Sequence, residues 1–330
     1  MCPFLIDYCD ITIDDDRFSQ ADAVVYHMRD HVDIQGANSK RKAHQRFVFN
    51  LWESPAHTEN LNGFKQFFNW TMTYRFQSDI ITSYYSGNPY VHISSPFHQL
   101  MLKEKSMKNL NISFNKKLDQ LTDEIFAKKK LGTAVALITN CGGSSGRMAF
   151  IQSLQKYIDV KIYGRCGESC PANRNCREFL AENYYFLLSF ENSRCTEYAS
   201  KSLIDFTNRI RIFSFSLAEK FFETLEHPII PVVLGRTNYS YFIPSSGYIN
   251  TNQFTTMKAL AEYLNQTRND KKKYESYFAW KKDYVWGLSQ FFTPFCDLCV
   301  RLHLDTKPKV YDDISKWWFD GACEKPSILP

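Results

Sequence analysis

One stretch of this chain constrains the fold more than any other, because it combines two apolar runs with a helical piece between them. Residues 184–190 form a strand-like apolar run, and the polar residues 191–193 follow it directly. A helical piece over residues 219–225 leads to a second buried run, residues 229–234. Open α/β sheets bind ligands where their strands end. The stretch therefore predicts a βαβ unit with a ligand site after its first strand.

The same alternation of strands and helices extends through most of the chain, and it implies mainly parallel sheets joined by right-handed crossovers. The polar, strand-poor residues 103–130 interrupt it and are typical of a connector. The predicted fold class is therefore α/β, with two Rossmann-like domains facing a cleft and a C-terminal helical tail. Further strands are predicted over residues 21–27, 47–52, 79–81, 133–139, 160–164 and 248–249, and helices over residues 61–74, 147–157 and 257–264.

The composition is that of a folded globular protein, with 44% hydrophobic and 16% aromatic residues. The net charge of +5 is mild and is not concentrated on one helix, so nucleic acid is not an expected partner. No apolar run reaches about 18 residues, and the start lacks the basic flank and the length of a signal peptide. Any targeting segment or membrane anchor is therefore expected to lie outside this chain.

Ten cysteines allow two interpretations, disulfide bonds or structural zinc. Cys296 and Cys299 have the spacing of half a zinc site. Four Asn-x-Ser/Thr sequons favour the secretory pathway, where thiols oxidise, so disulfides are the favoured interpretation and their pairing stays open. The disulfide candidates are Cys2, Cys9, Cys141, Cys166, Cys170, Cys176, Cys195, Cys296, Cys299 and Cys323, and the candidate glycosylation sites are Asn69, Asn111, Asn238 and Asn265.

Three places carry side chains suited to group-transfer chemistry. Glu53 follows a strand directly, so its carboxylate is a candidate general base, and His57 is the rival. The Gly- and Ser-rich residues 140–147 lie between a strand and a helix, where backbone N–H groups and Arg147 could hold a phosphate. An ordinary βα turn is the alternative there. Lys220 is expected at the carboxyl edge of the same sheet, where it could meet a phosphate.

Motifs along nearly the whole chain resemble the alpha-1,3-fucosyltransferase family, and the cysteine-rich form is similar to its animal members. These motifs are residues 53–58 (ESPAHT), 69–80 (NWTMTYRFQSDI), 162–167 (IYGRCG) with Cys170-Pro171, 190–198 (FENSRCTEY), 219–220 (EK), 230–235 (IPVVLG), 277–281 (YFAWK) and 295–299 (FCDLC).

The resemblance implies a GT-B architecture with an acceptor domain over residues 1–125, a donor domain over residues 126–285 and a cysteine-containing tail over residues 286–330. It implies inverting transfer of L-fucose from GDP-fucose to the 3-hydroxyl of an N-acetylglucosamine in a glycan of a glycoprotein or glycolipid. Since cationic side chains can absorb the diphosphate charge, no cofactor is required, although a divalent metal could be stimulatory. The implied catalytic base is Glu53, and the implied donor-binding residues are Arg147, Asn192, Tyr198, Glu219 and Lys220.

The resemblance also implies a location. Members of the family are type II membrane proteins of the Golgi lumen, and this chain begins near the family's first cysteines. It is therefore expected to lack the cytoplasmic tail, the membrane anchor and the stem, so that it would meet a membrane only through an anchor absent from this chain.

One segment departs from the family pattern. Residues 201–218 separate Tyr198 from Glu219 and Lys220, which are close neighbours in the family's donor motif. The segment is unlike a polar surface loop, and we interpret it as a retained intron or a misplaced exon boundary. Gln77, where the family usually has Asp, is a smaller departure. Two alternatives stay open: an insertion-disrupted or otherwise non-catalytic sugar-binding relative, and a zinc-stabilised binding module.

Overall fold

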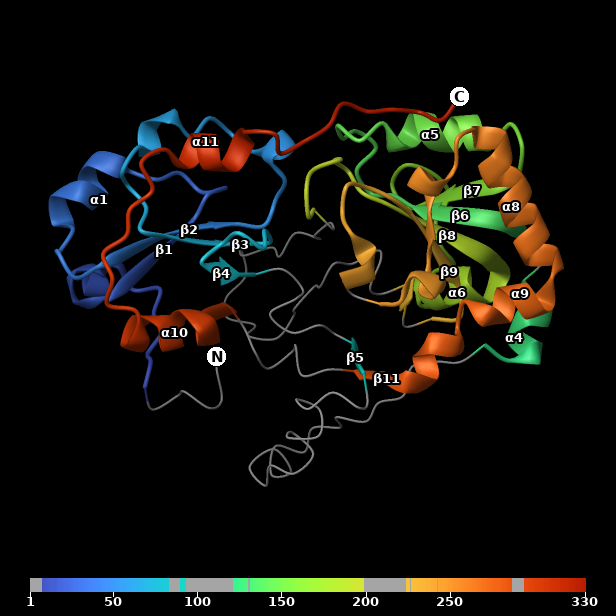
Figure 1. Cartoon of the computed structure of the whole chain (residues 1–330), viewed down its shortest axis with the longest axis horizontal. Helices are drawn as coiled ribbons and strands as arrows, with labels where there is room; N and C mark the ends of the chain where they lie inside the picture. The colour runs from blue at the N-terminus through green and yellow to red at the C-terminus, as the bar shows by residue number, and fades with distance from the viewer. Residues whose placement is uncertain are drawn as a thin grey trace, which may run out of the picture. The chain divides into compact units, whose positions relative to one another are not determined.

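The computed structural model describes residues 8–82, 90–92, 121–129, 131–198, 224–225, 227–241, 243–286 and 294–330. The chain divides into two compact units, each built on its own parallel sheet (Figure 1). The first unit comprises Met1–Asn88, Cys195–Glu197 and Leu288–Cys323, and the second unit comprises Pro89–Arg194, Tyr198–Gly287 and Glu324–Pro330.

The first unit contains a four-stranded parallel sheet in the order β1-β2-β3-β4. The strands predicted at residues 21–27, 47–52 and 79–81 are confirmed as β1, β2 and β4. The central strands are apolar and buried almost throughout, as is typical of parallel strands covered on both faces. The bounds are β1 (Ala23–His27), β2 (Arg46–Leu51), β3 (Trp70–Thr73) and β4 (Ile80–Ile81).

Two C-terminal helices, α10 (Pro294–Leu304) and α11 (Ile314–Phe319), cover opposite faces of this sheet (Figure 1). Leu298 of α10 packs into the core with Val48. Trp318 of α11 packs edge-on against Phe49, with ring centroids 5.4 Å apart. Consecutive strand residues point to opposite faces of a sheet. Val48 therefore lies on the face covered by α10, and Phe49 lies on the face covered by α11.

The helix predicted over residues 61–74 is wrong. Only Asn62–Phe64 form a short 3-10 turn, and Trp70–Thr73 form β3, which pairs with β2. The aromatic residues that suggested a helical spacing instead pack on one another, with Phe67 and Phe68 rings 4.9 Å apart. A strand buried on both faces lacks alternation, so its apolar run imitates a helix face.

The second unit contains a five-stranded parallel sheet in the order β10-β9-β8-β6-β7. All five strands are at the predicted positions: β6 (Gly132–Leu137), β7 (Val160–Tyr163), β8 (Tyr184–Phe190), β9 (Ile230–Leu234) and β10 (Ile249–Asn250). The chain runs outward from β6 to β7 on one side and from β8 to β10 on the other. The strand order therefore reverses between β6 and β8, which is where parallel α/β sheets place their ligands.

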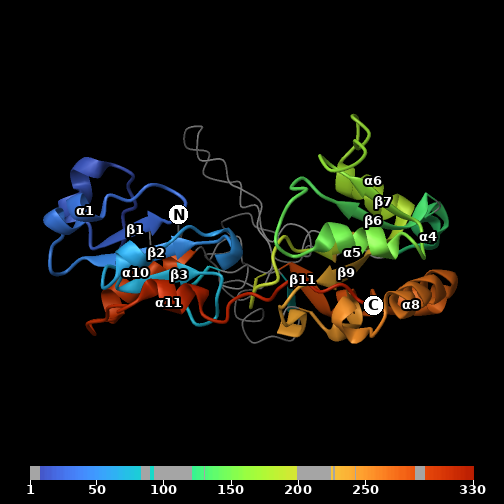
Figure 2. The same cartoon turned by 90° about the horizontal axis from the view of Figure 1, so that it is seen from above.

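Helices cover both faces of this sheet (Figure 2). On one face, α5 (Arg147–Leu154) and α8 (Met257–Asn269) bury Phe150, Leu154 and Leu260 against the strands. On the other, α6 (Cys176–Asn183) buries Leu180. The helix predicted after the loop at residues 140–147 and the helix predicted over residues 257–264 are confirmed as α5 and α8.

The helices among the described residues are α1 (Ile34–Lys40), α4 (Asp123–Lys128), α5 (Arg147–Leu154), α6 (Cys176–Asn183), α8 (Met257–Asn269), α9 (Lys271–Ser276), α10 and α11. The 3-10 turns are η1 (Asp15–Gln20), η2 (Pro55–His57), η3 (Asn62–Phe64), η4 (Tyr239–Tyr241), η5 (Ser245–Gly247), η6 (Thr251–Gln253) and η7 (Ala279–Asp283). A small antiparallel ladder pairs β5 (Tyr90–His92) with β11 (Tyr284–Trp286).

Disulfide bonds join most of the described cysteines, which confirms the favoured interpretation of the cysteine content. Cys296 is also disulfide-bonded, and Cys2 lies outside the described residues. The zinc alternative does not hold for Cys299, because its sulfur is bonded to Cys9 and so is not a free thiolate. The pairs are Cys9–Cys299, Cys141–Cys166, Cys170–Cys176 and Cys195–Cys323.

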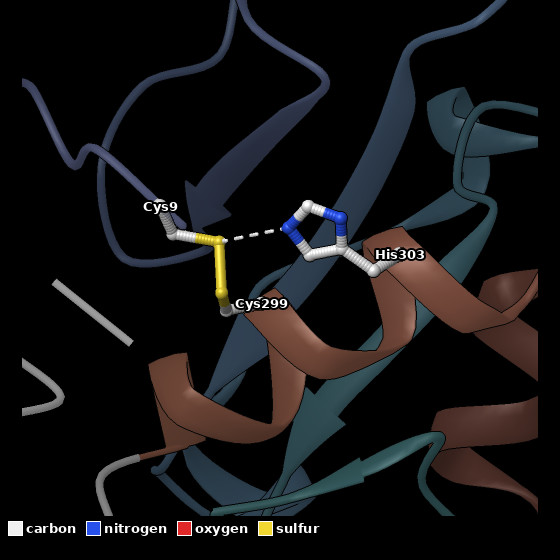
Figure 3. A group of neighbouring side chains, drawn as sticks. All are labelled: Cys9, Cys299 and His303. Carbon is white, nitrogen blue, oxygen red and sulfur yellow. Dashed lines mark hydrogen bonds between the residues drawn. A yellow bond between two sulfur atoms is a disulfide. The ribbon is translucent and has the colours of Figure 1, made fainter. Parts of the chain in front are cut away.

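His303 lies beside the Cys9–Cys299 bond (Figure 3). Its Nε2 is 3.8 Å from the Cys9 sulfur and 3.3 Å from the carbonyl oxygen of Tyr8. With both sulfurs oxidised, this group holds the N-terminal segment against α10 rather than forming a metal site. Among the helices of the described residues, none combines the length and the apolar character needed to cross a bilayer.

Candidate functional site

The reversal point of the second sheet is formed by two loops, one after β6 and one after β8. Ser145 N donates a hydrogen bond to the Asn192 carbonyl oxygen at 3.0 Å. Gly143 has φ of +116°, and a Cβ there would come within 2.8 Å of the same oxygen. Only glycine fits both the left-handed backbone and this close approach. The Gly- and Ser-rich loop predicted for phosphate binding is thus fixed directly on the polar residues that end β8.

Arg147, the first residue of α5, is buried in this corner, with 3% of its surface exposed. Its guanidinium donates to the carbonyl oxygens of Phe190, at 3.2 Å, and Asn140. Burial lowers the pKa of Arg147, and the nearby Glu191 and Tyr198 oppose that shift. The Nε–H of Arg147 has no hydrogen-bond partner among the described residues. The structure therefore brings Arg147 to the sheet edge but uses both of its terminal guanidinium nitrogens to bind backbone carbonyl oxygens.

Glu191 is a buried carboxylate among residues 191–193, where the sequence predicts a ligand site, but it is not one of the predicted donor-binding residues. It follows β8 directly and lies close to Gly235, where an added Cβ would meet Glu191 Cγ at 3.6 Å and the Tyr239 hydroxyl at 2.6 Å. Burial raises the pKa of Tyr239 strongly, and Glu191 adds to that shift. In the sequence, Glu191 could be noticed because it is a carboxylate at the end of a buried strand. No feature of the sequence pointed to Tyr239.

The other predicted donor-binding residues are divided between the described and the undescribed parts of the chain. Tyr198 is buried and lies within electrostatic range of Arg147, and Asn192 is half-buried on the loop that holds Ser145. The structure thus brings three of the five predicted residues to one corner of the second unit. Glu219 and Lys220 lie outside the described residues, as does most of the helix predicted over residues 219–225.

In the first unit, Glu53 follows the carboxyl end of β2, as predicted, and 12% of its side chain is exposed. Its Oε2 lies 3.6 Å from Arg29 Nη1, and its Oε1 accepts a hydrogen bond from Ser54 N at 2.9 Å. His57, the rival base, ends the following 3-10 turn, and its Nε2 is buried without a hydrogen-bond partner among the described residues. Glu53 is thus the better oriented of the two candidates.

Tyr74 and Arg75 follow the end of the neighbouring strand β3, where Leu51 and Thr73 are register partners. Arg75 donates to the carbonyl oxygen of Trp317 at 2.7 Å and to that of Trp318. Burial raises the pKa of Tyr74 far above its ordinary value, Arg75 opposes that shift, and Glu53 and Glu197 reinforce it. The carboxyl edge of the first sheet therefore gathers a buried phenol and charges of both signs.

The sequon at Asn69 does not fit a glycosylated residue in this fold, which corrects that prediction. Asn69 is 8% exposed, its Nδ2 donates to the Lys309 carbonyl oxygen at 2.8 Å, and its Oδ1 accepts from Phe47 N at 2.7 Å. A glycan on Nδ2 would displace the segment around Lys309. Asn238 is exposed, Asn265 is half-buried on α8, and Asn111 lies outside the described residues.

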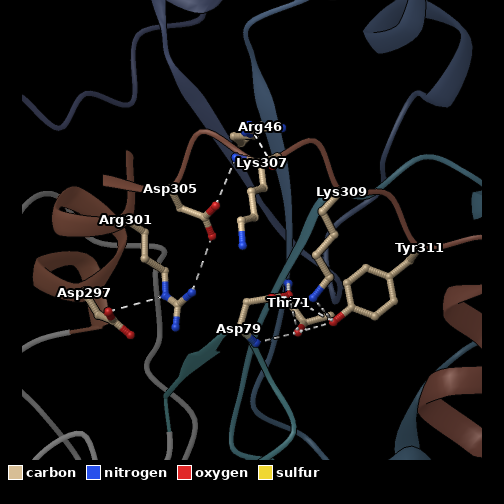
Figure 4. A network of polar contacts seen from close by, with 9 residues as sticks. All are labelled: Arg46, Thr71, Asp79, Asp297, Arg301, Asp305, Lys307, Lys309 and Tyr311. Carbon is tan, nitrogen blue, oxygen red and sulfur yellow. Dashed lines mark hydrogen bonds and ion pairs between the residues drawn. The ribbon is translucent and has the colours of Figure 1, made fainter. Parts of the chain in front are cut away.

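A second polar network fixes the segment after α10, residues 305–312, which we call the C-terminal strap (Figure 4). Asp79 accepts hydrogen bonds from the Tyr311 hydroxyl and from Thr71 N, both at 2.9 Å, and from Lys309. Arg46 donates to the Lys307 carbonyl oxygen at 3.2 Å. These residues lie at the amino ends of β2, β3 and β4, away from Glu53, so the network is structural.

The chain has two Rossmann-like units, and each carries polar side chains at the carboxyl edge of a parallel sheet. This arrangement defines the class of the GT-B glycosyltransferases. Comparison with known proteins gives the family. A model described as "Glycosyltransferase family 10 (fucosyltransferase) C-term" matches residues 127–212 and 216–317, and one described as "Fucosyltransferase, N-terminal" matches residues 1–85. The chain therefore belongs to the family 10 fucosyltransferases.

Relatives and a solved structure agree with this assignment. The chain is 33% identical over 308 residues to alpha-(1,3)-fucosyltransferase C of Drosophila melanogaster, covering 91% of this chain and 66% of that protein. It is 31% identical over 309 residues to 4-galactosyl-N-acetylglucosaminide 3-alpha-L-fucosyltransferase FUT6 of Homo sapiens, covering 91% of this chain and 72% of that protein. A crystal structure of an alpha1,3-fucosyltransferase shares the fold, with a TM-score of 0.51, 16% identity and coverage of 87% and 79%.

Proposed function

We propose that this chain transfers L-fucose from GDP-fucose to the 3-hydroxyl of an N-acetylglucosamine in a glycan, with inversion at the anomeric carbon. The observation that carries the proposal is Glu53, a nearly buried carboxylate at the carboxyl end of β2 in a chain of the fucosyltransferase family. The relatives' names state the same sugar, the same linkage position and, for the human protein, an N-acetylglucosaminide acceptor.

The chemistry requires a base on the acceptor side and charge stabilisation on the donor side. Glu53 takes the proton of the acceptor hydroxyl while that oxygen bonds to the anomeric carbon of fucose, and the bond from that carbon to the diphosphate oxygen breaks. The electron pair of the broken bond leaves with GDP and adds a negative charge to its diphosphate. Arg147 and Lys220 would stabilise that charge. Tyr198, Asn192 and Glu219 shape the nucleotide-sugar pocket in this proposal. Cationic side chains can supply the charge stabilisation, so we propose that no cofactor is required and that a divalent metal is at most stimulatory.

The contacts of Glu53 support its role. The hydrogen bond from Ser54 N fixes one carboxylate oxygen, and Arg29 Nη1 lies 3.6 Å from the other. A carboxylate held at a strand end is oriented before the acceptor arrives, which lowers the cost of reaching the reactive geometry.

The test replaces Glu53 with Gln and measures fucose transfer from GDP-fucose to N-acetylglucosamine-containing glycans. Removing a general base is expected to lower kcat by about 10²- to 10⁴-fold, while the affinity for GDP-fucose stays near that of the parent chain. Glu59→Gln is the matched control, because Glu59 is an exposed residue of the same segment. Full activity of Glu53→Gln, or folded parent protein that never transfers fucose, would overturn the proposal.

We also propose that the chain works in the Golgi lumen and that the full-length protein is held there by a type II anchor. The disulfide bonds support an oxidising compartment. The alternative, a non-catalytic sugar-binding relative, is favoured by residues 201–218, which divide the donor motif in the sequence. Transfer assays on this chain with and without that segment separate the two.

A further inference from the structure

Residues 324–330, which we call the end segment, have no helix or strand of their own and run past α5 in the second unit (Figure 1). They follow the last residue that the family models match. Both ends of the segment are fixed by backbone hydrogen bonds. Glu324 N donates to the Arg194 carbonyl oxygen at 2.9 Å. The Pro330 carbonyl oxygen accepts from Met257 N, at the start of α8, at 2.8 Å.

The side chain of Arg194 holds the middle of the end segment. It is buried, and its Nη1 donates to the Ser327 carbonyl oxygen at 3.1 Å and to the Ser327 hydroxyl at 2.6 Å. Its Nη2 lies 3.7 Å from Glu324 Oε2. Burying a charge costs free energy unless the charge is paired and hydrogen-bonded, and these partners all belong to the end segment. The segment is therefore tied to Arg194, two residues after Asn192.

The end segment touches the Gly- and Ser-rich loop at Gly146. Gly146 is the N-cap of α5, directly before Arg147, and its φ is +72°. A Cβ added there would lie 2.7 Å from Pro326 Cβ, so Pro326 rests directly against the glycine backbone. Gly143 makes a similar approach to the Asn192 carbonyl oxygen. The loop thus has two close contacts, one with the end of β8 and one with the end segment, and each requires a glycine.

We propose that Pro326 and Arg194 are positioning residues for the donor. Arg194 fixes Ser327, and the adjacent Pro326 restrains Gly146, so the loop and the start of α5 with Arg147 are held in shape before GDP arrives. A loop that is already ordered does not lose that freedom on binding, which improves affinity. This inference rests on the proposed function, in which Arg147 stabilises the charge on GDP. It gives a part in donor binding to residues outside the sequence motifs of the family.

The test compares GDP binding by the parent chain, Pro326→Gly and Lys325→Gly, measured by isothermal titration calorimetry. Both variants add a glycine at neighbouring exposed positions, but only Pro326→Gly removes the side chain that rests against Gly146. Pro326→Gly is expected to weaken GDP binding by about three- to tenfold, because GDP must then order the loop. Lys325→Gly should stay within about twofold of the parent chain. Equal affinities of Pro326→Gly and the parent, or equal losses in both variants, would overturn the inference.

Arg194 is tested by substitution alone and together with Pro326. Arg194→Met removes the donors to Ser327 and should weaken GDP binding to a similar extent, and Arg194→Lys, which keeps a donor, should recover part of the loss. Because Arg194 is proposed to act through Pro326, the double variant Arg194→Met, Pro326→Gly should lose little more than the larger single loss. Losses that add would refute this route. Arg165→Met is the control, because Arg165 is an exposed arginine of the same unit.

Two further readouts separate the positioning role from a loss of stability and from the proposed function. The KM for GDP-fucose should rise in Pro326→Gly while kcat stays within about twofold, whereas partial unfolding would lower kcat at an unchanged KM. Without ligand, amide hydrogen exchange at Ser145 and Arg147 should be faster in Pro326→Gly and unchanged in Lys325→Gly. Unchanged exchange in Pro326→Gly refutes the restraint even if the parent chain binds no GDP. Faster exchange in a chain whose folded parent binds no GDP would instead overturn the proposed donor site and leave the restraint standing.

Discussion

At the scale of single residues, the second unit buries a cation at each edge of its sheet. At the carboxyl edge Arg147 donates to backbone carbonyl oxygens and has Glu191 nearby. At the amino edge Lys129, 1% exposed, donates to the carbonyl oxygens of Tyr184, at 2.8 Å, and Ala181. A guanidinium stays charged when buried, whereas an ammonium gives up its proton more readily. The two cations should therefore respond differently to pH.

Lys129 is expected to make stability depend on pH. Burial lowers the pKa of Lys129 to about 7, Glu182 opposes that shift, and Lys281 adds to it. Between about pH 7 and its unfolded pKa near 10, the unfolded chain binds the proton that the folded chain lacks. The free energy of unfolding should therefore rise with pH in this window, by about 1.4 kcal/mol per unit from this group, and fall as pH drops toward 7.

Urea unfolding between pH 7 and 9 checks this prediction. Lys129→Met removes the titrating group, so its free energy of unfolding should change less with pH than that of the parent chain. Lys128→Met is the control, because Lys128 is the exposed neighbour and pairs with Glu124 at 2.7 Å. Equal pH slopes in Lys129→Met and the parent chain would contradict the prediction.

Residues differ in how far the sequence predicts their positions. The position of Glu53 is predictable because a carboxylate directly after an apolar run must lie at a strand end. Glu197 is not, because its place depends on a disulfide to Cys323 and a contact with Phe76, both far away along the chain. Asn69 has the sequence of a glycosylation site, yet tertiary contacts with the C-terminal strap bury its amide. Local patterns cannot report such contacts.

At the scale of elements, strand positions were predicted well and one helix was not. Strands β6, β8 and β9 of the second unit are apolar runs bounded by polar turns, which leaves little ambiguity. The strand Trp70–Thr73 is short and follows three aromatic residues, so its pattern resembles a helix face. The pairing of β3 with β2 decides its structure, and pairing is a property of the sheet rather than of the segment.

The C-terminal strap is expected to stabilise the first unit through Asp79. The Asp79 side chain is 11% exposed and binds Lys309, Tyr311 and Thr71. Asp79→Asn keeps one acceptor but loses the charge that pairs with Lys309. We expect it to lower the free energy of unfolding by about 1 to 2 kcal/mol, measured by chemical denaturation. Asp312→Asn removes an exposed charge from the same strap and should have little effect. Equal stabilities of the two variants would count against the network.

At the scale of the whole molecule, the segment from Phe190 to Tyr198 serves both units. Glu191–Arg194 and Tyr198 belong to the second unit, whereas Cys195–Glu197 belong to the first and are bonded there to Cys323. The chain returns to the second unit at Glu324, whose backbone N–H donates to the Arg194 carbonyl oxygen at 2.9 Å. Changes in this segment should therefore affect the folding of both units.

Residues 201–218 follow this motif, and their removal is the last test. Deleting them places Glu219 and Lys220 directly after Ser200, the spacing of the family's donor motif. If Lys220 then pairs with the diphosphate, a charge-assisted hydrogen bond worth about 1.5 to 3 kcal/mol should tighten GDP binding by about ten- to hundredfold. Isothermal titration calorimetry with GDP measures the change. A Gly/Ser linker of equal length in place of residues 201–218 should bind GDP as weakly as the parent chain. Equal GDP affinities of the parent and the deletion variant would mean that the segment does not impair the donor site. Separately, a transcript that reliably encodes residues 201–218 would rule out a retained intron.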